Sequence, residues 1–320
     1  MEKPLVSVYC LAYNHEKYIK TALEGFVKQK TQFSYEVIVH DDASTDGTAD
    51  IIKEYAENYP DIIKPIFQRE NQYSKGISFI HEIIYPYIRG KYVAVCEGDD
   101  YWCDENKLQR QVDWMENHPE YVFCGHNTLI INQNTGEQRC FCKESEDRDV
   151  SMNDLLKKPR PFFHTSSFLF RTEYWNVPLE LQTKEFGDYP RAIYMCLSGK
   201  VRYLHEVMSV YRLYAEDSWS TKTDHSPESK KRTNDLFSAL LQLLDNLNAY
   251  TNGDYNIQIT NLKTDIEYKM LLNNEEYETI IKYYKKRLNQ EKIIKRFKIH
   301  AHYRFPGLIR FYRRIKGIKS

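Results

Sequence analysis

The sequence predicts an α/β protein in which a mostly parallel central sheet is flanked by helices and followed by a helical C-terminal appendage. Three observations predict this fold class. The first hundred residues alternate between strand-like runs and segments with apolar residues at helical spacing. The strand-like runs are almost continuously apolar, as in parallel strands that are buried on both faces. From Asp224 onward the chain is polar and has a helical pattern.

The first hundred residues contain four expected strands. These strands are residues 5–11, 36–40, 62–68 and 92–96, and the expected helices are residues 18–28, a segment through Ile51, Ile52 and Tyr55, and residues 79–88. Because crossovers between parallel strands are right-handed, the strands belong in one sheet with helices on both faces.

The later part of the chain is more mixed. Helices are expected at residues 108–117 and 189–197, strands at residues 121–132, 167–171 and 201–211, and a hairpin-like turn at residues 132–136. No repeat or low-complexity linker marks a boundary. We therefore place the domain boundary where the sequence becomes polar and helical. This gives an α/β domain over residues 1–222 and a helical, basic region over residues 223–320.

Charge is distributed unevenly along a chain of 320 residues whose formal net charge is zero. Residues 281–320 contain 14 Lys and Arg residues against a single acid, Glu291, so the rest of the chain is acidic. No run approaches the roughly 18 apolar residues of a membrane-spanning helix, and no signal peptide is recognisable. We therefore expect a cytoplasmic protein. Seven cysteines without zinc-type spacing indicate reduced thiols.

Two acidic clusters stand where strand-like runs end. Asp41-Asp42 follows the second expected strand, and the segment from Glu97 to Asp100, which reads EGDD, follows the fourth. Open α/β sheets bind ligands at the carboxyl ends of their strands, so we expect both clusters in one cleft. Neighbouring carboxylates repel one another unless a cation lies between them. The clusters therefore predict a divalent metal that holds a phosphorylated ligand.

The order and spacing of three segments resemble glycosyltransferase family 2. The segments are Ala12-Tyr13-Asn14, Val39 to Thr48, and Glu97 to Asp100. The resemblance is close over about the first 120 residues and looser up to about residue 220. It implies a GT-A type fold, a Rossmann-like architecture, with an inverting mechanism and a metal-bound nucleoside-diphosphate sugar, usually a UDP-sugar.

The resemblance also implies how the nucleotide is bound. Asp42 corresponds to the residue that accepts the imide N–H of uracil, and Tyr13 falls on the position whose ring stacks on the base. Arg69 and Asn71 follow the third strand, where the family also contacts the nucleotide. The alternatives are turn chemistry for Asp42, a core position for Tyr13, and solvated loop positions for Arg69 and Asn71.

The EGDD segment corresponds to the Asp-x-Asp element of this family, with Glu97 in place of the first aspartate. Hard carboxylate oxygens suit Mn²⁺ or Mg²⁺. One of Asp99 and Asp100 is expected to bind the metal and the other the ribose or its surroundings, and the sequence does not assign which. The alternative is a solvated acidic loop.

An inverting transfer also needs a base that deprotonates the acceptor hydroxyl. The family places this base before a helix at a position that corresponds to Asp188, and the alternative role for Asp188 is a helix N-cap. His164 lies in the region that faces the acceptor in related enzymes, and acceptor binding and structural hydrogen bonding both stay open for it. Many relatives carry a histidine two residues beyond the arginine that corresponds to Arg212, whereas this chain has Tyr214.

Residues 283–319 interleave basic residues with apolar and aromatic ones. Such a segment can lie on an anionic membrane surface, where each basic residue contributes about 1 kcal/mol. A solvated helical face is the alternative. Nucleic-acid binding is not expected, because no RNA- or DNA-binding signature accompanies the charge. We therefore expect the protein at the inner face of the cell membrane.

Together these patterns predict a metal-dependent inverting glycosyltransferase. It would move a sugar from a UDP-sugar to a hydroxyl of a glycan or lipid-linked acceptor during bacterial surface polysaccharide assembly. One alternative is a non-catalytic protein of the same fold that binds sugar nucleotides or glycans, which Tyr214 favours. The other is a nucleotidyltransferase, but this class needs a basic, Gly-rich loop after the first strand, where the chain reads Ala12-Tyr13-Asn14-His15.

Overall fold

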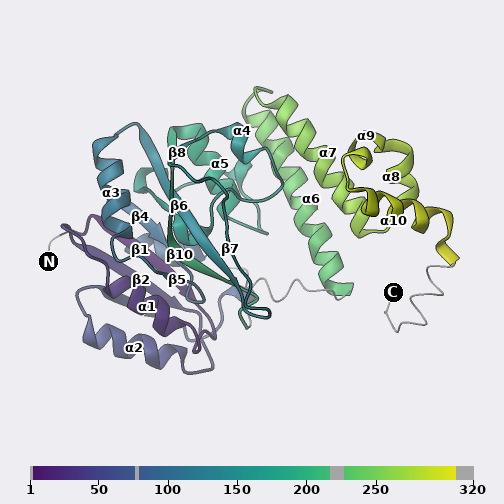
Figure 1. Ribbon diagram of the computed structural model, residues 1–320. Helices are drawn as coiled ribbons and strands as arrows, with labels where there is room; N and C mark the ends of the chain where they lie inside the picture. Colours follow the sequence, from purple (N-terminus) through teal and green to yellow (C-terminus); the bar gives the residue numbers. More distant parts are fainter. Residues whose placement is uncertain (1–2, 76–78, 217–226, 308–320) are drawn as a thin grey trace. The chain divides into compact units, whose positions relative to one another are not determined.

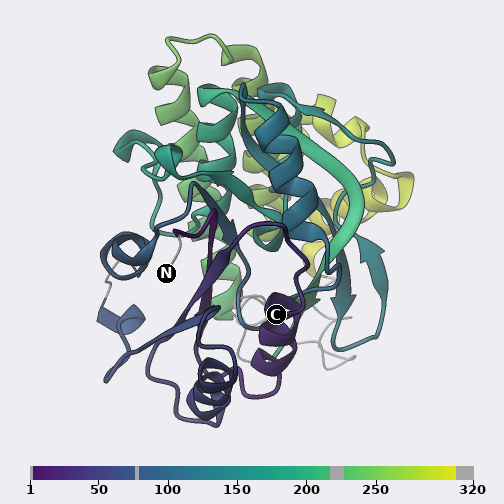
Figure 2. The ribbon, with the colours of Figure 1, turned by 90° about the vertical axis from the view of Figure 1, so that its left-hand side faces the viewer.

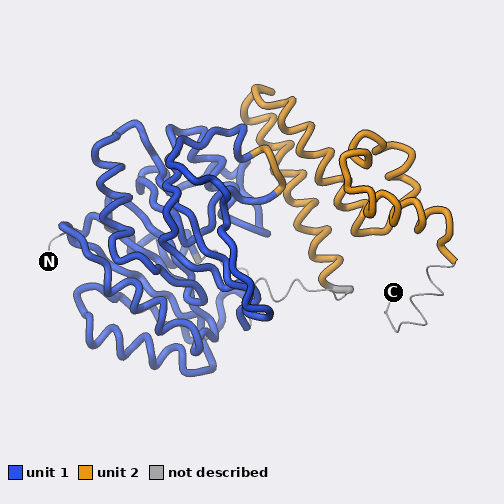
Figure 3. Tube along the Cα trace, viewed as in Figure 1, with its two compact units in different colours: residues 1–155, 160–224 blue, residues 156–159, 225–320 orange. Residues whose placement is uncertain are grey.

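The structure is a computed structural model that describes residues 3–75, 79–216 and 227–307 (Figure 1). The chain divides into two compact units, the first comprising residues 1–155 and 160–224 and the second residues 156–159 and 225–320 (Figure 3). The predicted domain boundary, between residues 222 and 223, lies outside the described residues.

Four parallel strands form one part of the sheet in the first unit, as the alternating pattern predicts. They are β1 (Val6–Ala12), β2 (Tyr35–Asp41), β3 (Ile63–Phe67) and β4 (Tyr92–Val95), in the order β3-β2-β1-β4. The pairs between these neighbours are all parallel. Every residue of β2 and β4 is buried, which explains their nearly continuous apolar sequences.

The sheet continues beyond β4 with strands from the later part of the chain. They are β5 (Tyr101–Trp102), β6 (Tyr121–Asn132), β9 (Leu169–Arg171) and β10 (Lys200–Leu213), in the order β4-β9-β6-β10-β5. The short strands β7 (Gln138–Cys140) and β8 (Arg148–Val150) pair with β6 and β10. β9 is antiparallel to both of its neighbours, whereas the long β10 runs parallel to β6. Most paired residues are therefore in parallel ladders, as predicted.

Helices flank this sheet (Figure 2). The α-helices of the first unit are α1 (Ile19–Val27), α2 (Thr48–Asn58), α3 (Lys107–Asn117), α4 (Met152–Leu155) and α5 (Asp188–Ser198). The 3₁₀ turns are η1 (Tyr73–Lys75), η3 (Tyr85–Tyr87), η4 (Thr165–Ser167), η5 (Thr172–Tyr174) and η6 (Leu179–Leu181). On α1 the buried residues Ile19, Ala22, Leu23 and Phe26 recur at helical spacing, so one face of the helix packs into the core.

The prediction of an α-helix at residues 79–88 is wrong, because this segment forms other kinds of helical turn. The segment forms a π-helical turn, η2 (Phe79–Ile84), followed by the 3₁₀ turn η3. Pro86 is the second residue of η3. Proline has no amide hydrogen, and its ring clashes with the carbonyl group of the preceding turn, so an α-helix does not continue through this position.

A buried polar network joins β1 and β2 to the turn before β4. The Ser7 hydroxyl donates to Glu36 Oε1 at 2.7 Å and accepts the amides of Arg89 and Gly90 at 3.0 and 2.8 Å. Arg89 Nε donates to Glu36 Oε2 at 3.0 Å. Because the buried carboxylate and hydroxyl both have partners, this network stabilises the register of the strands.

The second unit is helical, as predicted. Its helices are α6 (Pro227–Tyr250), α7 (Asn256–Asn273), α8 (Tyr277–Tyr283), α9 (Lys285–Asn289) and α10 (Ile293–Arg304). Tyr268, Ile280, Leu288 and Ile299 form a small core between the last four of these helices. Among the residues that the structure describes, no helix has both the length and the apolar character needed to cross a membrane.

Candidate active site

Both acidic clusters are attached to the carboxyl end of β1. The Asp42 amide donates to the Ala12 carbonyl oxygen at 3.0 Å, and the Gly98 amide donates to the Leu11 carbonyl oxygen at 2.9 Å. β1 lies between β2 and β4, so the turns after these two strands emerge on either side of it. The strand order therefore makes two clusters that are distant in sequence neighbours in space.

Glu97, Asp99 and Asp100 form a compact carboxylate cluster after β4. One oxygen from each side chain lies within 4.8 Å of the others. Asp99 and Asp100 are 9% and 1% exposed. Glu97 is exposed, and its side chain lines the cavity described below. Burial and the neighbouring carboxylates raise the pKa of Glu97 to about 8 and the pKa of Asp100 well above its usual value.

This carboxylate cluster fits a hard divalent cation. Carboxylate oxygens are the ligands that Mg²⁺ and Mn²⁺ prefer. A cation between the side chains would also remove the mutual repulsion that raises their pKa values. The donor set is therefore chemically consistent with the metal that the sequence predicts.

Arg212, on β10, holds the acidic turn in place. Its amide donates to Asp100 Oδ1 at 2.9 Å, and its Nη1 donates to the Asp99 carbonyl oxygen at 2.7 Å. The guanidinium group also lies 4.5 Å from the centre of the Tyr101 ring. Arg212 therefore fixes the orientation of the turn through backbone and side-chain contacts together.

His164 approaches the same cluster from the turn before β9. Its Nε2 lies 3.7 Å from Asp100 Oδ2, its Nδ1 lies 2.8 Å from Ser166 Oγ, and its ring stacks on Tyr211 with centroids 4.3 Å apart. Burial lowers the pKa of His164 to about 3, so the imidazole is neutral at neutral pH. His164 thus lines the site and also makes a structural hydrogen bond, whereas acceptor binding stays a prediction for it.

Tyr214 directly follows β10. Its φ angle is +63°, a left-handed conformation that is uncommon for a bulky residue. His205 is exposed within β10 and its Nδ1 lies 2.6 Å from Asp147 Oδ1, whereas His164 lies beside Asp100.

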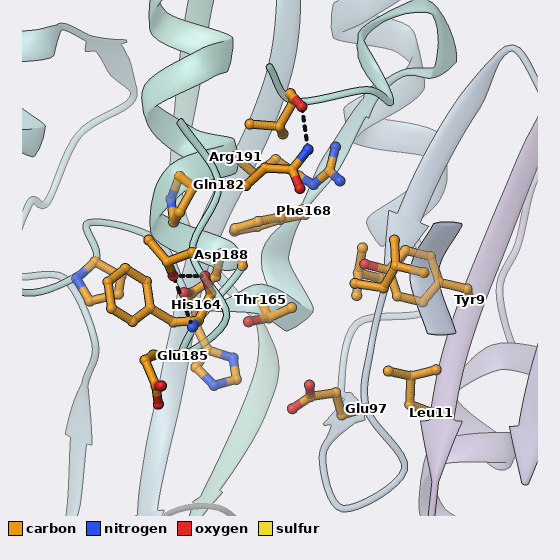
Figure 4. Close-up of a pocket in the computed structure, with 18 of the residues that line it drawn as sticks. Tyr9, Leu11, Glu97, His164, Thr165, Phe168, Gln182, Glu185, Asp188 and Arg191 are labelled. Atoms are coloured by element: carbon orange, nitrogen blue, oxygen red, sulfur yellow. Dashed lines mark hydrogen bonds between the residues drawn. The ribbon is translucent and has the colours of Figure 1, made fainter. Parts of the chain in front are cut away.

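A cavity of about 550 Å³ opens beside the carboxylate cluster (Figure 4). Asp99 lines it, and Glu97 lies across it from Asp188, the first residue of α5. The Tyr189 amide donates to Asp188 Oδ1 at 2.8 Å, and burial raises the pKa of Asp188. A volume of this size is typical of pockets for small ligands. The fold thus brings the predicted base and predicted metal ligands to one cavity.

Asp42 is not among the residues that line this cavity. Its carboxylate accepts the amides of Gln72 and Tyr73 at 2.7 and 3.1 Å and so holds the loop after β3. The reason is sheet geometry. β1 separates β2 from β4, and two strand spacings amount to roughly 10 Å.

The other predicted nucleotide contacts lie on the loops around Asp42. Asn71 Nδ2 donates to the Asp42 carbonyl oxygen at 3.3 Å, and Arg69, two residues earlier, is exposed. Tyr13 follows β1 and is 39% exposed, so it is not a core aromatic residue. The Thr45 amide donates to Asn14 Oδ1 at 2.8 Å and thereby joins the loops after β1 and β2. None of these loop residues lines the cavity, and all of them lie on the loops after β1, β2 and β3.

Sequence reasoning missed two charged residues of the cavity, Glu185 and Arg191. Of these, Arg191 is the buried one. It lies on α5 one turn after Asp188 and is 6% exposed. The sequence contained a signal, because Ile193 and Met195 on the same helix are apolar and buried. A charged residue in such surroundings is rare unless it has a partner.

The fold is that of known glycosyltransferases. The mannosyltransferase PcManGT from Pyrobaculum calidifontis, solved in complex with GDP-Man and Mn²⁺, aligns with a TM-score of 0.57. The two proteins are 15% identical, and the alignment covers 99% of this chain and 84% of that chain. The first unit therefore has the GT-A type fold that the sequence predicts.

The sequence comparisons identify the family. The model for Glycosyl transferase family 2 matches residues 7–177. An uncharacterized protein of Mycobacterium tuberculosis is 36% identical over 243 residues, which are 75% of this chain and 68% of the relative. The UDP-Glc:alpha-D-GlcNAc-diphosphoundecaprenol beta-1,3-glucosyltransferase WfaP of Escherichia coli is 29% identical over 66% of this chain and 78% of the relative. The chain belongs to glycosyltransferase family 2.

Mn²⁺ is expected to raise the thermal unfolding temperature of the wild-type protein, and Asp99→Asn should lose this increase. A ligand that binds only the native state stabilises it, and the variant lacks one of the predicted metal ligands. Without metal, Asp99→Asn should be at least as stable as the wild type, because it removes a charge that, in addition to burial, raises the pKa values of the neighbouring Glu97 and Asp100. Thermal unfolding with and without Mn²⁺ measures both effects.

Asp50→Asn is the control for this experiment, since Asp50 is an exposed acid on α2. It should keep the full response to Mn²⁺. An Asp99→Asn protein that is clearly destabilised in the absence of metal would contradict the prediction and assign Asp99 a structural role.

Proposed function

We propose that the protein is an inverting, metal-dependent glycosyltransferase. It transfers a sugar from a nucleoside-diphosphate sugar, a UDP-sugar, to a hydroxyl of a glycan or lipid-linked acceptor in bacterial surface polysaccharide assembly. One observation carries this proposal. Asp99 lines the same cavity as Glu97 and Asp188, and the latter two lie across it from each other.

An inverting transfer needs the nucleophile and the leaving group on opposite faces of the anomeric carbon. The carboxylate cluster occupies the side of the leaving diphosphate, and Asp188 occupies the side of the acceptor. The Asp188 carboxylate takes the proton of the acceptor hydroxyl during the attack. Burial raises the pKa of Asp188, which makes it a stronger base than an exposed aspartate.

Asp99 and Asp100 are the proposed metal ligands, with Glu97 beside them. A bound Mn²⁺ or Mg²⁺ supplies positive charge that stabilises the leaving diphosphate, so no protein acid is needed on that side. Arg212 keeps both aspartates in position through its bonds to Asp100 Oδ1 and to the Asp99 carbonyl oxygen. The Mn²⁺ in the PcManGT complex supports this assignment.

The proposed nucleotide is UDP, bound by the loops after β1, β2 and β3. Tyr13 stacks on the base, Asp42 accepts the uracil imide N–H, and Arg69 and Asn71 contact the nucleotide from the third loop. A carboxylate offers about four acceptor positions, and two loop amides use two of those on Asp42. The relative WfaP, which is named as a glucosyltransferase that uses UDP-Glc and a diphosphoundecaprenol-linked acceptor, supports the choice of UDP as the nucleotide.

A second candidate function is a non-catalytic sugar-nucleotide-binding protein on the same fold. Tyr214, in place of the usual histidine, favours it. Hydrolysis of UDP-sugars by the wild-type protein with Mn²⁺ distinguishes the two candidates. Turnover supports the enzyme, whereas binding without turnover supports the second candidate.

The apolar surface of α10 supports contact with a membrane. Ile293, Ile294 and Phe297 are 81%, 72% and 73% exposed, and their spacing places them on one side of the helix. Ile299 is buried on the other side. Basic residues such as Lys295 stand between these apolar residues in the sequence. We therefore propose that α10 lies on an anionic membrane surface, where a lipid-linked acceptor is located.

Asp188→Asn is expected to lower the rate of sugar transfer by about 100- to 10,000-fold, which is the usual contribution of a general base. UDP affinity should stay near normal, because Asp188 lies outside the predicted nucleotide loops. UDP release measures transfer, and calorimetry measures binding. Glu185→Gln, at another acid of the cavity wall, is the matched control. Loss of UDP binding in Asp188→Asn would mean that the residue is structural.

The uracil contact predicts that the wild-type protein binds UDP more tightly than CDP, because cytosine has no N–H at its N3 position. Asp42→Ala should weaken UDP binding and remove this preference. Calorimetry with both nucleotides measures the change, and the affinity for CDP reports any disturbance of the loop after β3. A preference for UDP that persists in Asp42→Ala would contradict the proposed role.

The membrane proposal predicts that the protein sediments with vesicles containing phosphatidylglycerol and much less with phosphatidylcholine vesicles. Changing Ile293, Ile294 and Phe297 to Ser should weaken binding at least about 100-fold, because each buried apolar side chain contributes about 1.5 kcal/mol or more. Ile257→Ser is the control, since Ile257 is 75% exposed on α7. Equal sedimentation of the triple variant and the wild type would refute this role of α10.

A further inference from the structure

Arg191 is a buried cation in the cavity that the proposed reaction does not use. Its guanidinium group lies over the rings of Phe170 and Trp175, at 4.7 and 5.5 Å from their centres. Its Nη1 donates to the Trp175 carbonyl oxygen at 3.0 Å. From α5 the side chain extends toward the side of the cavity where Tyr9 lies (Figure 4). The two rings therefore hold the charge in a defined place.

Within the described part of the chain, no carboxylate lies within ion-pair distance of Arg191. The bond to Trp175 is the one hydrogen bond that its side chain makes to the described residues. An arginine side chain has five N–H donors, so most of them are left for a ligand. Removing a cation from water without a partner anion costs several kcal/mol. A bound anion would supply the missing partner.

Arg171 shows how this protein satisfies a buried arginine that has only a structural role. Arg171 is 9% exposed and also lies over an aromatic ring, that of Tyr92. Its Nε and Nη2 donate to the carbonyl oxygens of Tyr121 and Met115 at 2.8 Å, and its Nη1 donates to the Tyr92 hydroxyl at 3.1 Å. Each of the three nitrogens of Arg171 thus has a protein acceptor, whereas Arg191 has such an acceptor on only one nitrogen among the described residues.

The cavity therefore contains opposite charges in different places. Glu97, Asp99, Glu185 and Asp188 supply the acids, and Arg191 supplies the cation, with His81 also lining the cavity. Burial and the charge of Arg191 lower the pKa of His81, which leaves the guanidinium as the positive group there. The planar fork of a guanidinium group matches the two oxygens of a carboxylate.

Building on the proposed glycosyltransferase function, we propose that the sugar held in this cavity carries a carboxylate, as in a uronic acid, and that Arg191 binds it through two parallel hydrogen bonds. The phosphates of the donor belong at the metal ligands, so the anion at Arg191 is a separate substituent of the sugar. This sugar is either the transferred residue or the terminal residue of the acceptor, and the two sources are distinguished by experiment.

Calorimetry on the full chain with Mn²⁺ tests the proposal in two arms. The donor arm compares UDP-glucuronic acid with UDP-glucose, which differ only in the group at C6. The acceptor arm compares methyl glucuronide with methyl glucoside, with and without UDP. We expect the carboxylate ligand to bind at least about 10-fold more tightly in one arm, which identifies the source. Equal affinities within both arms would overturn the proposal.

Three variants test the residue itself. Arg191→Met keeps the apolar stem and loses the charge, so it should abolish the preference for the carboxylate ligand. Arg191→Lys keeps the positive charge but loses the planar guanidinium group, so it should retain only part of the preference for the carboxylate ligand. Arg171→Met, the matched control, should leave the preference unchanged. A preference that survives in Arg191→Met would overturn the assignment.

These outcomes are separable from failure of the proposed function. If UDP and the UDP-sugars do not bind the wild-type protein, the glycosyltransferase assignment fails, while the methyl glycoside arm without UDP still tests Arg191. The comparison of ligands on the wild-type protein does not depend on the folding of any variant. Thermal unfolding of each variant shows whether its fold is intact.

Discussion

Repulsion among the carboxylates of Glu97, Asp99 and Asp100 is the interaction on which the site depends. These groups are held within 4.8 Å of one another at the end of β4, which is unfavourable without a cation. Arg212 keeps Asp100 in this arrangement, and it comes from a strand 112 residues later in the chain. A local turn joins the Asp100 amide to the Glu97 carbonyl oxygen at 3.1 Å, but the contacts from Arg212 form only when β10 has joined the sheet.

The helix α5 gives the cavity its second wall and two opposite charges. Asp188 and Arg191 lie one helical turn apart, so both reach the same space from one rigid element. Asp188 is the proposed base for an acceptor hydroxyl, and Arg191 is held by the rings of Phe170 and Trp175. A sugar bound here would be oriented by its anomeric carbon at one end and by its charged substituent at the other.

Membership in glycosyltransferase family 2 accounts for the fold and the acidic turn. Around this turn, Tyr214 has a left-handed backbone conformation, and His164 places a neutral imidazole near Asp100 from another part of the sheet. The arrangement of the cluster thus depends on contacts from β10 and from the turn before β9. Such side chains, rather than the fold itself, decide what a site can do.

The sequence alone determined the parallel strands β1 to β4, the acidic turns at their ends and the helical character of the second unit, because apolar periodicity and the residues that end a strand are local properties. It misjudged residues 79–88, where Pro86 prevents an α-helix. Only the tertiary structure decided that Asp188 faces Glu97, that Asp42 does not line their cavity, and that Arg191 is buried without a carboxylate among the described residues. These relations depend on strand order and on packing between distant segments, which the spacing of residues along the chain does not encode.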